Sequence, residues 1–144
     1  MIDISGKSFP SEFESGKAPL PQVIETAGKK ALQFIADATT QSSPVSVKGH
    51  TLDFSKGILL KVSFRDEAEQ NNEYPRLLDN KDISLQIVSR APRKVKFMLY
   101  KSENEYAQVV SELPFLDEKQ WHLAEAAYDP VKKKIYLQLD GGDC

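Results

Sequence analysis

The residues of this 144-residue chain that could do acid–base chemistry are its carboxylates and two histidines. Hydrolysis by a carboxylate pair, as in glycoside cleavage, needs two acidic groups held at a working separation. The acidic groups here fall in predicted loops and turns: Asp66-Glu67 with Glu69, Glu103-Asn104-Glu105, and Asp117-Glu118. The sequence also has no Ser-His-Asp order, phosphate-binding loop or dinucleotide fingerprint. It therefore assigns no catalytic residue.

Oxygen ligands for a metal ion are concentrated on one predicted turn, which carries Asp79, Asn80 and Asp82. Calcium prefers several oxygen ligands and tolerates irregular geometry, so these three residues are candidate calcium ligands. Asp and Asn are equally typical of turns without a metal, because their side chains cap their own backbone. The sequence is therefore compatible with a bound calcium ion at this turn and equally with no cofactor. Cys144 is the only cysteine, which excludes an internal disulfide and a Cys-rich metal cluster.

The candidate ligand-binding residues are Tyr100, Tyr136, Gln138 and Trp121. Each tyrosine, and Gln138, alternates with apolar residues along its strand and so faces away from them. If the two strands are neighbours, Tyr100, Tyr136 and Gln138 share one outer surface. Aromatic rings stack on the C–H faces of sugars and amides bond to hydroxyls, so such a surface suits a carbohydrate. The alternatives are a polar outer face with half-buried tyrosines, and a Trp121 that anchors the core or its rim.

Period-two alternation of apolar and polar residues indicates the strands that must position these side chains. The clearest strand begins after Gly57 and alternates over 58–65, and a second runs over 134–139. Shorter strands are predicted over 23–25, 31–35, 45–47, 77–78, 83–87, 95–100, 106–113 and from 121. A helix over 26–38 competes with the strand at 31–35 on propensity. Asp140-Gly141 after an alternating run is a hairpin signal, because the tight turn needs positive φ.

Many short strands with turn signals between them predict an all-β, antiparallel sandwich. Residues 1–19 are expected to form an extended lead-in, and residues 20–144 one domain. With 19 basic and 21 acidic residues the chain lacks the basic excess of an electrostatic nucleic-acid binder. No apolar run approaches the roughly 20 residues of a membrane-spanning helix. The first residues lack the basic region followed by an apolar one that is typical of a signal peptide.

Three segments, in order, carry a resemblance to a known family. They are Gly28-Lys29-Lys30-Ala31-Leu32-Gln33-Phe34, the stretch 52–64, and Trp121-His122-Leu123-Ala124 with Tyr128-Asp129 and Ile135-Tyr136-Leu137-Gln138-Leu139-Asp140-Gly141. Together they resemble the laminin-G-like jelly-roll branch of the concanavalin A-like lectin/glucanase superfamily. Ala126-Ala127 depart from the branch, which usually has larger β-branched residues there. Its members normally continue after Asp-Gly, so the resemblance also implies missing C-terminal strands and an exposed strand edge open to pairing.

The resemblance implies a jelly-roll sandwich that acts as a non-catalytic carbohydrate- or protein-binding module of a larger secreted or surface protein. The expected partner is a glycan or an extracellular protein, and the expected location is extracellular, periplasmic or at the cell surface. Two alternatives remain. One is a structural spacer or assembly domain beside a catalytic domain, and the other is a fragment of a glycoside hydrolase. Fold alone does not choose among them.

Overall fold

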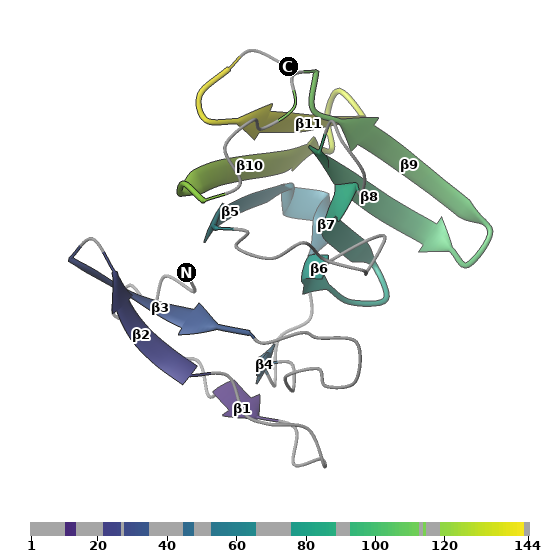
Figure 1. Ribbon diagram of the computed structural model, residues 1–144. Coiled ribbons are helices and arrows are strands. Elements are labelled where there is room, and N and C mark those ends of the chain that lie inside the picture. Colours follow the sequence, from purple (N-terminus) through teal and green to yellow (C-terminus); the bar gives the residue numbers. More distant parts are fainter. Residues whose placement is uncertain are drawn as a thin grey trace. The chain divides into compact units, whose positions relative to one another are not determined.

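The structure, a computed structural model, describes residues 11–13, 22–26, 28–34, 45–47, 53–65, 76–88, 93–112, 114 and 119–142. These residues form antiparallel strands and one short 3₁₀ turn, so the predicted all-β class is confirmed (Figure 1). The chain divides into two compact units, 1–51 and 52–144. This division lies further along the chain than the boundary after residue 19 that the sequence suggested.

The first unit contains two small strand pairs. β1 (Ser11–Phe13) pairs with β4 (Val45–Val47), so a short strand lies inside the predicted lead-in. β2 (Gln22–Thr26) and β3 (Lys29–Gln33) form a hairpin in which Gly28 has a φ of 70°. The competing helix over 26–38 is therefore wrong for 29–33. Tight turns with positive φ favour glycine, and Gly28 stops any helix there.

The second unit contains two antiparallel sheets. In the three-stranded sheet, β10 (His122–Asp129) lies between β11 (Lys134–Leu139) and β5 (Ile58–Phe64). In the four-stranded sheet, each strand pairs with the next along the chain: β6 (Arg76–Asp79), β7 (Ile83–Val88), β8 (Lys94–Ser102) and β9 (Glu105–Val110). A 3₁₀ turn, η1 (Phe54–Lys56), leads into β5.

The two sheets share one hydrophobic core, which gives the unit a sandwich-like character. Phe64, Ala124, Ala126 and Leu137 come from the three-stranded sheet, and Ile83, Leu85, Ile87, Val95 and Phe97 from the other. Ala126 lies in register between Leu60 on β5 and Leu137 on β11, and it is fully buried. A small residue on the central strand, flanked by two leucines, leaves space for side chains of the facing sheet.

The Asp-Gly turn predicted after β11 is present. Asp140 and Gly141 have φ values of 53° and 75°, and the Gly142 N–H donates to the Leu139 carbonyl at 3.0 Å. Positive φ at both central residues is the pattern of a tight hairpin turn. Within the described residues, β11 pairs on one edge only, with β10. The predicted pairing of that strand edge with a partner stays a prediction.

Candidate functional site

The four predicted ligand-binding residues do not form one surface. Tyr100 lies on β8 of the four-stranded sheet, whereas Tyr136 and Gln138 lie on β11 of the three-stranded sheet. The sheets face each other through the residues that alternate with them, such as Phe97 and Leu137. Tyr100 and Tyr136 therefore lie on opposite outer faces, because successive residues of a strand point to opposite sides. The predicted platform that combines them is not formed.

Tyr136 and Gln138 border a shallow hollow of about 280 Å³ on the outer face of the three-stranded sheet. In register, Tyr136, Ala127 and Leu59 form one row across the sheet. The next row holds Gln138 and an ion pair between Glu125 and Lys61. Leu59 is 65% exposed and Tyr136 is 38% exposed. We call this region the outer-face hollow; it offers a single aromatic ring.

Trp121 precedes β10 on the same outer face but at its other end. It is six residues from Ala127, or roughly 20 Å along an extended strand. The Arg65 guanidinium lies 5.6 Å from the centre of its ring, in cation–π range. The indole Nε1 is buried and has no hydrogen-bond partner in the part of the chain that the structure describes. Trp121 therefore takes no part in the outer-face hollow. It packs at the rim, which was the alternative to a ligand-binding role in the sequence analysis.

Tyr100 belongs to a larger hollow of about 400 Å³ in the second unit, which we call the aromatic hollow. It is lined by four aromatic residues, Phe54, Tyr100, Tyr106 and Tyr128, together with Leu99, Lys101, Glu105 and Ala107. The rings of Tyr100 and Tyr106 have centroids 6.0 Å apart and planes 57° apart. Those of Phe54 and Tyr128 are 6.5 Å and 64° apart. The rings of each pair are thus steeply inclined to each other, and they do not form a flat platform.

Sequence reasoning missed three of these four rings. Tyr106 lies directly across from Tyr100 in the β8–β9 hairpin, whose turn is at Glu103 and Asn104. The register of that hairpin was the available signal, because residues opposite each other on an antiparallel pair share a face. No comparable signal connects Phe54 with Tyr128, which come from segments far apart in the chain.

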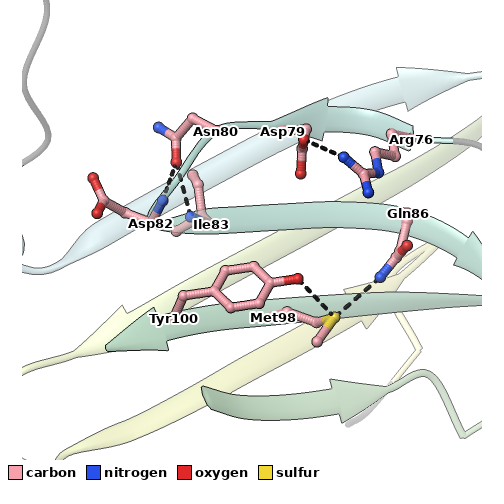
Figure 2. A network of polar contacts seen from close by, with 8 residues as sticks. All are labelled: Arg76, Asp79, Asn80, Asp82, Ile83, Gln86, Met98 and Tyr100. Atoms are coloured by element: carbon pink, nitrogen blue, oxygen red, sulfur yellow. Dashed lines mark hydrogen bonds and ion pairs between the residues drawn. The ribbon is translucent and has the colours of Figure 1, made fainter. Parts of the chain in front are cut away.

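A chain of side-chain contacts holds Tyr100 in place. Its hydroxyl donates to the Met98 sulfur at 3.4 Å, and the Gln86 amide donates to the same sulfur at 3.0 Å (Figure 2). Met98 and Gln86 are each 7% exposed. A thioether sulfur is a weak acceptor, so these contacts orient the ring more than they stabilise the fold. Tyr100 also lines the aromatic hollow.

Phe54 and Tyr128 are brought together by the entry into β5. Asp53 caps η1, accepting from the Ser55 hydroxyl at 2.6 Å and the Ser55 N–H at 3.1 Å. The hydroxyl bond first, and then the backbone bond, hold the pKa of the Asp53 carboxyl below its ordinary value. Gly57 follows with a φ of 79°, and a Cβ there would lie 2.8 Å from the Tyr128 carbonyl oxygen. Only glycine fits this close approach.

Two of the three predicted calcium ligands, Asp79 and Asn80, make side-chain contacts at the turn between β6 and β7. The Asn80 side-chain oxygen accepts from the N–H groups of Asp82 at 2.7 Å and Ile83 at 2.8 Å. Asp79 forms an ion pair with Arg76 at 2.6 Å (Figure 2). These contacts match the backbone-capping interpretation of the turn. No group of three metal-ligating side chains occurs among the described residues, and the calcium ion stays a prediction.

A polar pair that the sequence did not single out connects β10 to the turn after β11. The His122 Nδ1 lies 2.7 Å from one Asp140 carboxylate oxygen, and the Leu123 N–H donates to the other at 2.7 Å. His122 is only 8% exposed and lies against Phe64, with ring centroids 5.6 Å apart. We call this the His–Asp clip. It connects the Trp-His and Asp-Gly parts of the motif that carried the family resemblance.

Paired carboxylates of the kind that a glycosidase needs are not found at either hollow. The outer-face hollow has one carboxylate, Glu125, which is paired with Lys61. The aromatic hollow also has one, Glu105, paired with Lys101 at 2.9 Å. Among the described residues, neither hollow therefore holds the two carboxylates that a glycosidase uses.

None of the described segments is a helix long and apolar enough to cross a membrane. In the comparisons with known proteins, no family model, no curated protein and no solved structure matches the chain.

Proposed function

We propose that this chain is a non-catalytic binding module whose ligand is a carbohydrate, held in the aromatic hollow. The observation that carries the proposal is the gathering of Phe54, Tyr100, Tyr106 and Tyr128 around one open hollow of about 400 Å³. The volume is within the usual range of small-ligand sites. Rings that meet at angles offer both faces and edges to the C–H groups of a sugar.

The polar groups of the aromatic hollow suit the same ligand. The hydroxyls of Tyr106 and Tyr128, together with the Lys101–Glu105 pair, can exchange hydrogen bonds with sugar hydroxyls. The resemblance to the laminin-G-like jelly roll adds the remaining parts of the proposal. On that resemblance, the second unit is proposed to have a jelly-roll sandwich fold and to act within a larger secreted or surface protein, outside the cell or in the periplasm.

The test is a binding screen on immobilised neutral and acidic polysaccharides with the full 144-residue chain. Tyr106→Ala is the diagnostic variant, because Tyr106 is 51% exposed and its loss leaves the core intact. Tyr136→Ala is the matched control on the outer-face hollow. We expect wild type and Tyr136→Ala to bind alike and Tyr106→Ala to bind weakly. Equal loss in both tyrosine variants, or no binding by a folded wild type, contradicts the proposal.

A second candidate function, a protein-packing or spacer role, is favoured by the outer-face hollow. Leu59 and Tyr136 are exposed in one row, with Ala127 between them. Apolar residues gathered on a surface are typical of contacts with another protein. The corresponding test is Leu59→Lys, which should reduce self-association and raise solubility without changing glycan binding. Unchanged solubility would count against this second role.

A further inference from the structure

The charges around the aromatic hollow point to the class of carbohydrate that it takes. Its charged residues are Lys101 and Glu105, and their side chains pair at 2.9 Å. The rest of its lining is aromatic, leucine and alanine. The hollow is thus electrically neutral. Recognition of sulfate or carboxylate groups, in contrast, requires basic side chains with donors left for the anion.

We propose that the aromatic hollow selects neutral oligosaccharides over sulfated or uronic-acid glycans, and that the Lys101–Glu105 pair sets this selectivity. The inference rests on the proposed carbohydrate function of the same hollow. Glu105 acts in two ways. It neutralises the Lys101 charge by pairing with one of the three ammonium donors, and its own charge repels an anionic ligand. An uncharged sugar meets neither obstacle, since its hydroxyls can donate to the carboxylate and accept from the ammonium.

Two consequences distinguish a neutral ligand from an anionic one. Binding of a neutral ligand should change less than about twofold between roughly 0.05 M and 0.5 M NaCl, because screening acts on charge pairs. Binding of an anionic ligand should weaken steeply over the same range. Removing the acidic partner should also free Lys101, and the resulting positive hollow should gain affinity for anionic glycans.

The experiment measures binding of the full chain to a panel of defined probes at low and high salt. The neutral probes are cello-, xylo-, manno- and laminari-oligosaccharides, and the anionic probes are heparin, chondroitin sulfate and polygalacturonate. The diagnostic variant is Glu105→Gln. Glu125→Gln is the matched control, because it makes the same charge change beside Lys61 on the outer-face hollow.

We expect wild type to bind one or more neutral probes with little salt dependence. Glu105→Gln should raise affinity for anionic probes by roughly twofold to fivefold, the range of an exposed ion pair. Glu125→Gln should leave both classes unchanged. Wild type that prefers anionic probes, and loses them with salt, overturns the inference but keeps the carbohydrate function. An equal gain in both variants also overturns it. Failure of folded wild type to bind any probe overturns the proposed function itself.

Discussion

The two ends of strand β10 differ in what their side chains do. At its beginning, the His–Asp clip connects His122 to Asp140, and Asp140 also accepts from the Leu123 backbone. At its end, Tyr128 lines the aromatic hollow beside Phe54, where Gly57 approaches its carbonyl. One end is closed by polar contacts within the chain, whereas the other presents rings to solvent.

This contrast separates residues that hold the fold from residues that can bind. The motif residues His122 and Asp140 contact each other, and their polar groups are directed at the chain itself. The hollow at the other end draws on η1, β8, β9 and β10, and no short motif gathers these elements. Phe54 and Tyr128 belong to the segments that carried the resemblance and line the hollow, whereas His122 and Asp140, from the same segments, contact each other.

Asp140→Ala should produce the largest effect, at the clip end. It removes two hydrogen bonds, leaves the buried His122 without this partner, and places alanine at a φ of 53°. We expect a loss of about 3 kcal/mol in the free energy of unfolding, measured with urea. Asp140→Asn should lose less, because asparagine tolerates this φ and keeps an acceptor oxygen.

Asp79→Ala provides the control for that comparison, since it breaks an exposed ion pair with Arg76. Exposed pairs contribute at most about 1 kcal/mol. If Asp140→Ala costs no more than Asp79→Ala, the clip is not a stabilising element and the contrast between the two ends fails. Glycan binding by the folded fraction should be unchanged in all three variants.

Gly57→Ala should act at the other end with a smaller effect. An added Cβ would lie 2.8 Å from the Tyr128 carbonyl oxygen, so the backbone must shift. We expect a loss of about 2 kcal/mol in unfolding free energy, together with weaker binding at the aromatic hollow. Gly141→Ala is the matched control, because its φ of 75° is similar and a Cβ there meets nothing within 4 Å. Equal costs for the two variants would show that strain in φ, not the contact with Tyr128, is responsible.

Local patterns in the sequence were enough to predict several elements. Alternation over 58–65 predicted β5, which is observed at Ile58–Phe64, and Asp140-Gly141 predicted the positive-φ turn. Both signals are local, because side-chain period and turn chemistry depend on adjacent residues. The pairing of Tyr100 with Tyr136 failed for the opposite reason. Alternation determines the face of a strand on which a residue lies, but not the sheet to which that strand belongs.

The His–Asp clip and the aromatic hollow could not be predicted from the sequence for the same reason. His122 and Asp140 are 18 positions apart, and Phe54 and Tyr128 are further apart still. Their contacts depend on strand order and register, which a single sequence does not reveal. Tyr106 is the exception, because it is placed by the register of one local hairpin.

Tyr106→Ala tests the binding side of the contrast. Because Tyr106 is half exposed, its loss should change the unfolding free energy by less than about 1 kcal/mol. Loss of one stacking ring should weaken binding of the best neutral oligosaccharide about tenfold, or roughly 1.4 kcal/mol, measured by calorimetry. If the variant loses stability but keeps its affinity for the oligosaccharide, Tyr106 stabilises the fold and does not bind the ligand.

The smallest expected effect concerns Asp53, whose cap places Phe54 in the hollow. Its carboxyl has a pKa below the ordinary 3.8, chiefly through the Ser55 hydroxyl bond. A lowered folded-state pKa means that the charged cap contributes above pH 3.8 and is lost as pH falls through the lower value. Asp53→Asn mimics the protonated side chain, so wild type should be slightly more stable than this variant at pH 6. The two should converge as pH falls below the lowered pKa of Asp53, in parallel thermal melts. A difference that stays constant over this range would show that the charge of Asp53 does not strengthen the cap, and that shape alone holds Phe54 against Tyr128.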